Sequence, residues 1–378
     1  PALDVQLAEG RLIDAGDNAV TAPRALLTLA WGSSRAATSL AVASAAWMLS
    51  GLTPSPLING LLPAAVSAPL LLPLPSRPRL GTLLQQLASL MLLAIAARVI
   101  PAPVLATLSA LLLLSAGGQL VDLPVQRLLS GSAGVPMAAL RTGAEAGRLV
   151  GNSLAGILFP LGKALLQFSQ ALVLLLPLVA LVSWLRPAVA AAETTAVPAS
   201  ENAVVHHPSA ARLEPAPLLQ GILFGALFGL IPLWVRQEGA GNCFDFAMVL
   251  TAYGLGRAAA EALQPQMRLG SAPGYLLLAA GLAGTQLLPG WGAVLLFVPL
   301  GLLAASSDQH LILALGPADD PALRAQRFNR SACLGGLAGS IAMGLAGQAV
   351  GLAGVLPLQL LAFVLAAVLI PRLLPSRR

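Results

Sequence analysis

The feature that most constrains this chain is a series of apolar stretches, each long enough to cross a bilayer. Runs such as 165–185 and 355–370 are apolar on almost every side, and only 10% of the 378 residues are charged, against roughly 25% in a soluble domain. In lipid, backbone polar groups are satisfied only within helices or a closed barrel. A barrel requires short segments of alternating apolar and polar residues, which these runs lack. The sequence therefore predicts an all-α membrane protein, with the lipid bilayer as its first partner.

A membrane-spanning helix needs about 20 apolar residues, and this measure predicts about twelve transmembrane helices in two six-helix, pseudo-symmetric halves. They are placed near 25–49, 56–74, 80–99, 102–121, 138–160, 163–185, 217–235, 243–263, 272–289, 291–313, 329–350 and 354–373. A polar island separates the two sets. The expected regions are a cytoplasmic N-terminal arm at 1–23, an N-terminal half at 24–186, a cytoplasmic linker at 187–216 and a C-terminal half at 217–378.

The basic residues predict the orientation in the membrane. With a cytoplasmic N-terminus, 15 of the 21 basic residues fall on the cytoplasmic side, three on the opposite side and three within helices. That bias follows the positive-inside rule, so both termini and the linker are expected in the cytoplasm. The arginines occur singly or in pairs between apolar segments, a pattern unlike a nucleic-acid-binding face. We therefore expect no nucleic-acid partner.

Glycines recur at close spacing in two of the predicted helices. The fifth carries Gly143, Gly147, Gly151 and Gly156, and the eleventh carries Gly335, Gly336, Gly339, Gly344 and Gly347. Small residues at such spacing let helices approach closely. The fifth and eleventh helices are equivalent if the halves are repeats, which favours a duplicated architecture.

Three stretches resemble a known family of membrane proteins. Residues 45–74 are similar to its first-to-second helix turn, 117–158 to its fourth-to-fifth helix passage and 317–347 to its tenth-to-eleventh passage. The family is the major facilitator superfamily, particularly its macrolide-efflux and siderophore-exporter-like branch. The resemblance implies two rocking six-helix halves around a central cavity. It would be lined by the first, fourth, fifth, seventh, eighth, tenth and eleventh helices.

The chain departs from the family pattern at two places. The family usually has an acidic residue in its first helix for proton coupling, and Thr38 stands at the matching position. Its second-to-third loop normally locks the cytoplasmic gate through a Gly and an Asp, whereas residues 73–81 keep only the positive charges. Arg77 and Arg79 are therefore the gating-loop candidates, and both gating and proton coupling are open questions.

Ionisable residues within the membrane are the main candidates for function, because burying a charge there costs about 2.5 to 3.5 kcal/mol on insertion scales. Arg35 lies near the middle of the first predicted helix. It either binds an anionic group of a substrate or pairs with an acidic neighbour. Glu145 and Arg148 are three residues apart and can pair on one helix face, and Asn152 continues that face. The first substrate-cavity candidates are therefore Arg35, Glu145, Arg148 and Asn152.

The tenth predicted helix supplies the remaining candidates. Asp308 and His310 lie close together there, and histidine titrates near neutrality. They form either a proton-coupling relay or an ordinary helix end facing the cytoplasm. Asp308 is also a cavity candidate. In the eighth helix, Arg257 and Glu261 are spaced to pair with each other.

The expected function is secondary transport by alternating access, exporting or flipping an amphipathic small molecule or a lysolipid. No phosphate loop, metal-binding histidine pair or nucleophile elbow occurs in the sequence, so we expect no enzyme activity, no metal and no cofactor. The alternative is a membrane scaffold or assembly factor that keeps the fold, no longer transports and binds other membrane-protein subunits.

Overall fold

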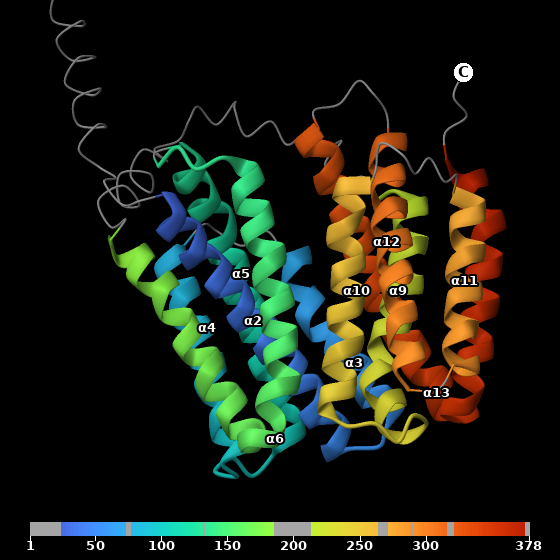
Figure 1. Cartoon of the computed structure of the whole chain (residues 1–378), viewed down its shortest axis with the longest axis horizontal. Coiled ribbons are helices and arrows are strands. Elements are labelled where there is room, and N and C mark those ends of the chain that lie inside the picture. The colour runs from blue at the N-terminus through green and yellow to red at the C-terminus, as the bar shows by residue number, and fades with distance from the viewer. Residues whose placement is uncertain are drawn as a thin grey trace, which may run out of the picture.

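The computed structural model describes residues 24–72, 77–131, 133–184, 213–263, 271–288, 290–315 and 321–374, and within them every regular element is helical (Figure 1). The predicted arm at 1–23 and nearly all of the predicted linker lie outside these residues. The elements are α2 (Arg24–Leu52), α3 (Pro56–Ser67), η1 (Ala68–Leu71), α4 (Pro78–Ala96), α5 (Pro103–Gly131), α6 (Met137–Trp184), α9 (Pro215–Gln237), α10 (Cys243–Leu263), α11 (Ser271–Leu287), α12 (Trp291–Ala314) and α13 (Pro321–Leu373).

The two longest elements each contain two spans. In α6 the side-chain amide of Gln167 donates to the carbonyl of Ala155, although twelve residues of straight helix would separate them by roughly 18 Å. The chain must therefore reverse between them, close to Pro160, and Figure 1 shows the two arms of α6 meeting at the lower end. In α13 the reversal occurs at Gly351, which has φ 76° and ψ 166°. The described helices thus make twelve spans, as predicted.

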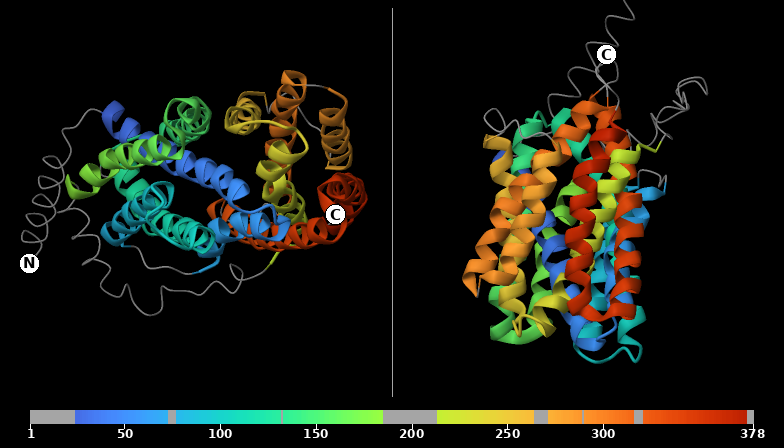
Figure 2. Two further views of the ribbon diagram at one scale, coloured as in Figure 1. Left: turned by 90° about the horizontal axis from the view of Figure 1, so that it is seen from below. Right: turned by 90° about the vertical axis from the view of Figure 1, so that its right-hand side faces the viewer.

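The spans form two groups that face each other. Helices α2–α6 make the N-terminal half and α9–α13 the C-terminal half, which lie side by side as blue-to-green and yellow-to-red groups in the left view of Figure 2. The halves meet where α3 packs on α13 and where the first arm of α6 packs on α10. These contacts join the second span to the eleventh and the fifth to the eighth. Exchanging the two halves maps one contact onto the other, so the arrangement is pseudo-symmetric.

The glycine stripes pack the corresponding helices of each half together. A Cβ atom added to Gly147 of α6 would collide with the backbone carbonyl of Gly32 on α2, and one added to Gly335 of α13 with that of Leu218 on α9. Each stripe therefore lets two helix backbones touch. The pairs are equivalent in the two halves: the first span with the fifth, and the seventh with the eleventh. The predicted role of both stripes, close helix packing, is confirmed.

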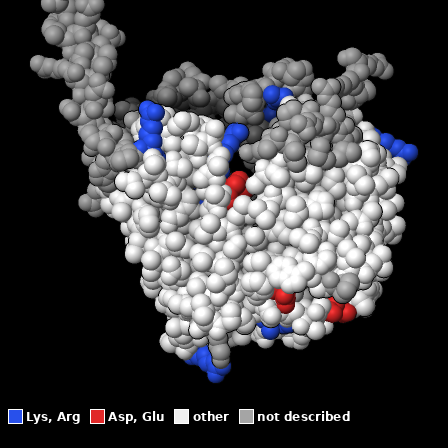
Figure 3. Space-filling model, viewed as in Figure 1, with Lys and Arg blue, Asp and Glu red and all other residues white. Residues whose placement is uncertain are grey.

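The molecular surface suits a bilayer along most of its height. Six stretches are long and apolar enough to cross a membrane: Pro78–Ala96, Pro103–Gly131, Ala164–Ser183, Pro215–Gln237, Trp291–Ala314 and Gln326–Leu373. On the face in Figure 3 the charged side chains gather near the two ends, and the surface between is almost entirely uncharged. The protein is a multi-pass membrane protein.

One predicted boundary is wrong in a way that matters for function. The fourth span was expected to end at residue 121, but α5 continues through Pro124 to Gly131. A proline within a transmembrane helix is tolerated because neighbouring groups satisfy the freed backbone. The extension places Asp122 inside a membrane helix.

Candidate functional site

A central cavity of about 420 Å³ lies between the two halves. It is lined by side chains of α2, α3, the first arm of α6, α9 and α10, so the first, fifth, seventh and eighth spans contribute as expected. The second span contributes unexpectedly, whereas the fourth, tenth and eleventh do not line this cavity. The lining residues are Arg35, Thr38, Ser39, Val42, Ala43, Ala46, Leu62, Pro63, Val66, Ser67, Arg148, Asn152, Phe228, Gly229, Ile231, Pro232, Phe246 and Leu250.

The two walls of the cavity differ in chemistry. Among the described lining residues, every polar side chain comes from the N-terminal half, and the six residues from α9 and α10 are apolar or glycine. The polarity also changes along the cavity. We call the end of the bundle where α2 and α9 begin the near end, and the end where they finish the far end. Arg35 lies on the near-end side of α2 and Ala46 toward the far end, roughly 16 Å apart along the helix.

Arg35 reaches the cavity from α2 and pairs with Asp122 of α5. Its Nη1 donates to Asp122 Oδ2 at 2.8 Å, and its Nη2 donates to the other carboxylate oxygen. The guanidinium also lies over the Trp31 ring, 4.0 Å from the centroid. Arg35 is 14% exposed and its Nε has no hydrogen-bond partner among the described residues. The pairing alternative foreseen for Arg35 is therefore confirmed, and Arg35 is also one of the residues that line the cavity.

Arg148 and Asn152 extend the polar corner from α6. Arg148 pairs with Glu145, as their spacing predicted, and remains 54% exposed. Asn152 Oδ1 accepts a 2.6 Å hydrogen bond from Ser39 Oγ, which leaves the Asn152 amide group free to donate. Glu145 does not line the cavity, so among the predicted candidates the structure brings Arg35, Arg148 and Asn152 together there.

Asp308 belongs to a separate polar cluster inside the C-terminal half. Arg257 Nη2 donates to Asp308 Oδ2 at 2.8 Å, and Gln220 Nε2 donates to Oδ1. Gln220 Oε1 in turn accepts from Tyr275 Oη and from Ser307 Oγ. This cluster ties α9, α10, α11 and α12 together and does not line the central cavity.

The cluster changes two predictions made for the C-terminal half. Asp308 is not a cavity residue, and Arg257 pairs with it across helices; the side chain of Glu261, the expected partner, lies outside the described part of the chain. No hydrogen bond joins Asp308 to His310, and His310 Nδ1 is buried without a partner in the part of the chain described. The geometry does not form the predicted Asp308–His310 relay.

The two gating-loop candidates stand at the start of α4. Arg77 precedes its first turn without a side-chain capping bond, and both Arg77 and Arg79 are exposed. The loop residues 73–76 lie outside the described part of the chain. A gating role for either arginine stays a prediction.

A contact that the sequence did not predict joins the halves at the far end. Arg236 of α9 donates from Nε to Ser50 Oγ at 3.0 Å and from Nη2 to the Trp47 carbonyl at 2.9 Å, both on α2. Its guanidinium lies 3.9 Å from the centroid of the Trp47 ring. The same ring stacks on Phe246 of α10 at 5.9 Å. We call Arg236, Trp47 and Ser50 the far-end latch.

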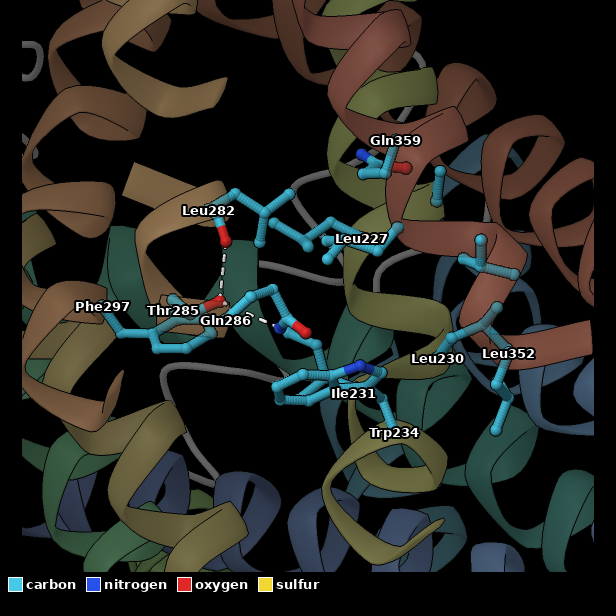
Figure 4. A pocket seen from close by; sticks show the side chains of 13 residues that line it. Leu227, Leu230, Ile231, Trp234, Leu282, Thr285, Gln286, Phe297, Leu352 and Gln359 are labelled. Carbon is cyan, nitrogen blue, oxygen red and sulfur yellow. Dashed lines mark hydrogen bonds between the residues drawn. The ribbon is translucent and has the colours of Figure 1, made fainter. Parts of the chain in front are cut away.

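A second pocket lies within the C-terminal half, between α9, α11, α12 and α13 (Figure 4). Its volume is about 50 Å³, and most of its lining is apolar. Thr285 and Gln286 supply polar groups, and Thr285 donates to the Leu282 carbonyl. Binding sites for drug-sized molecules are about 300 to 1,000 Å³. The central cavity is therefore the candidate site for a cargo.

Neither a protein-family model nor a curated protein matches the sequence, but solved structures do. A bacterial homologue of the iron transporter ferroportin, in an inward-facing state, matches with a TM-score of 0.67 at 16% identity, over 94% of this chain and 98% of that one. The chain has the major facilitator fold. A point mutant of the nucleoside transporter NupG matches at 0.63 and 12% identity (92% and 98% covered), and a D-xylose-proton symporter at 0.60 and 12% (93% and 98%).

The major facilitator fold brings together several residues that sequence reasoning missed. Asp122 was missed because the predicted fourth span ends at residue 121, whereas α5 continues to Gly131. Gln220 and Tyr275 gave no signal, because an isolated amide or phenol in a membrane helix usually bonds to a neighbouring helix. Arg236 is one of the three basic residues predicted on the non-cytoplasmic side, where its charge alone did not indicate contact with the other half. A list of every ionisable residue within ten positions of an apolar run would have found Asp122 and Arg236.

Proposed function

We propose that this protein is a secondary transporter that works by alternating access and moves an amphipathic small molecule or lysolipid. One observation carries the proposal: a cavity of about 420 Å³ lies between two pseudo-symmetric halves, with a polar corner on one wall and an apolar surface on the other. That volume falls within the range of small-molecule sites. An amphipathic cargo matches both walls at once.

The contacts between the halves support movement about the cavity. Transporters of this architecture expose a central site alternately by rocking one bundle against the other. The halves touch through close helix packing and through hydrogen bonds between neutral groups, such as the hydroxyls of Ser153 and Thr251, 3.2 Å apart. Such contacts hold few charges that rocking would have to separate. The far-end latch is the exception, and in this proposal it closes the cavity at that end.

The orientation completes the proposal. With the positive-inside bias, both termini lie in the cytoplasm, the near end of the cavity faces the cytoplasm and the latch faces the opposite side. Export from the inner leaflet or the cytoplasm follows naturally, as in the branch that the sequence resembles. Thr38, whose hydroxyl donates to the Ser34 carbonyl of its own helix, puts a hydroxyl where the family's first helix has an ionisable carboxylate.

The experiment measures distances between spin labels across the two ends. One pair would replace Leu52 and Leu288 at the far end, and the other Met137 and Leu213 at the near end, all exposed positions. Both native cysteines, Cys243 and Cys333, are first replaced by alanine. Alternating access requires two populated distances at each end that change in opposite directions. A single distance at each end, together with stoichiometric co-purification of other membrane subunits, would instead support the scaffold alternative.

A further inference from the structure

The polar corner of the central cavity is positively biased, and this bias defines a class of cargo. Arg35 and Arg148 line the cavity, and no Asp or Glu is among its lining residues in the described part of the chain. Their acidic partners, Asp122 and Glu145, are not among the lining residues. The lining therefore offers a bound cargo two cationic hydrogen-bond donors and no anionic group among its described residues.

Both guanidiniums keep N–H donors that their acidic partners do not use. An arginine side chain carries five N–H donors. Asp122 accepts one hydrogen bond from Nη1 and one from Nη2 of Arg35, and each of these nitrogens carries a second N–H group. The Nε atom is buried and is not counted among these donors. Glu145 accepts from a single nitrogen of Arg148. The amide of Asn152, whose oxygen already accepts a hydrogen bond from Ser39, adds a neutral donor one turn beyond Arg148.

The rest of the cavity is shaped for an apolar body. Beyond the polar corner the lining includes Val42, Ala43 and Ala46 of α2 and Phe228, Ile231, Pro232, Phe246 and Leu250 of α9 and α10. None of these side chains can hydrogen-bond. An apolar chain attached to the bound head would extend from Arg35 toward the far end, over the roughly 16 Å between Arg35 and Ala46.

We propose that the cargo is an amphipathic anion: a carboxylate or phosphate head bound between Arg35, Arg148 and Asn152, with its apolar body against α9 and α10. The inference rests on the proposed transport function and specifies its substrate class. Planar guanidiniums recognise carboxylates and phosphates by paired hydrogen bonds. The bound anion shares Arg35 with Asp122, so the two negative groups compete for one guanidinium.

The test measures equilibrium binding to the purified protein in nonionic detergent, using probes with one tail and different heads. Dodecyl phosphate and dodecanoate should bind at least tenfold more tightly than dodecyltrimethylammonium, and inorganic phosphate, which lacks the tail, should bind more weakly than dodecyl phosphate. Lysophosphatidate tests whether the anionic head belongs to a lipid. If it binds more tightly than dodecyl phosphate, the cargo is a lipid; if it binds more weakly, the cargo is a soluble amphiphile. Equal binding of the anionic and cationic probes would overturn the inference.

Variants of the three charged residues assign the site. Arg148→Gln should weaken dodecyl phosphate binding by roughly 10- to 100-fold, the loss of a charge-assisted hydrogen bond. Arg35→Gln alone would leave the Asp122 carboxylate without its partner. The double variant Arg35→Gln, Asp122→Asn therefore tests the loss of the Arg35 charge while the two positions keep a neutral pair. Asp122→Asn alone should tighten binding on the order of tenfold, because it removes the competing charge. A merely structural ion pair would leave anion binding unchanged or weaker in that variant.

The control is Arg127→Gln, which removes one positive charge from an exposed position of α5 outside the cavity. It should leave binding unchanged. Failure of this inference is distinguishable from failure of the transport proposal. Two spin-label distances without charge-selective binding would overturn the anion site alone, and charge-selective binding with a single distance would overturn alternating access alone.

Discussion

The far-end latch makes a quantitative prediction about the balance between the two conformations. Replacing Arg236 by glutamine removes a guanidinium that donates to Ser50 Oγ at 3.0 Å and to the Trp47 carbonyl at 2.9 Å and lies 3.9 Å from the Trp47 ring centroid. A net hydrogen bond from a charged group contributes about 1.5 kcal/mol at the lower end of its range, and a cation–π contact at a partly exposed site about 0.5 kcal/mol.

These contributions sum to roughly 3.5 kcal/mol in favour of a closed far end. Because each 1.4 kcal/mol is a factor of ten, the ratio of open to closed far ends should rise a few hundredfold in Arg236→Gln. A far end that is open in about one molecule per thousand would become open in roughly a quarter of them. The change is an equilibrium shift, so it needs no cargo to appear.

The assay is the distance between spin labels at positions 52 and 288, whose longer component should become plainly populated in Arg236→Gln. Arg236→Lys should give an intermediate result, because lysine keeps the charge but loses the planar fork. Arg98→Gln is the matched control: it removes an arginine from an exposed position just beyond α4, at the same end of the bundle. An unchanged distribution in Arg236→Gln, or equal opening in Arg98→Gln, would refute the latch.

Three further predictions concern packing, the second cluster and orientation. Gly147→Val should lower the free energy of unfolding by about 1 to 3 kcal/mol or prevent folding, since its side chain meets a backbone carbonyl of α2; thermal unfolding in detergent measures this, and Gly274→Ala, which meets open space, is the harmless control. Asp308→Leu should cost roughly 2 kcal/mol, less than a fully buried pair because Arg257 is 39% exposed, while binding of dodecyl phosphate stays unchanged. A protease site added at either terminus should be cleaved only from the cytoplasmic side, and cleavage from outside would contradict the assigned orientation.

Much of the fold could be predicted because lipid imposes a strong one-dimensional signal. The expected spans 25–49 and 291–313 fall within α2 and α12 as observed, since each apolar run must form its own hydrogen bonds within a helix. The predicted end of the fourth span was wrong because Asp122 and Pro124 lie two residues apart, and in isolation each of them suggests the end of a helix. Inside a bundle, a partner such as Arg35 makes the acid tolerable.

The candidate site was only partly predictable. Arg35, Arg148 and Asn152 could be found because polar groups are rare within apolar runs and each attracts attention on its own. Their partners across helices could not, since pairing depends on which helices are neighbours. Local spacing correctly joined Arg148 to Glu145, but it could not indicate that Arg257 would reach Asp308, 51 residues away.

The sequence by itself determined a membrane protein of twelve helices in two similar halves, with glycines placed where backbones must touch. Hydropathy and spacing suffice for this, because they act within each helix and its immediate stripe. Only the tertiary structure decided that polar side chains of one half face an apolar wall of the other, and that Arg236 bridges the halves. The physical reason is that helices in lipid gain no hydrophobic energy by choosing one neighbour over another. Their choice depends on shape and a few polar contacts, and these exist only once the helices are assembled.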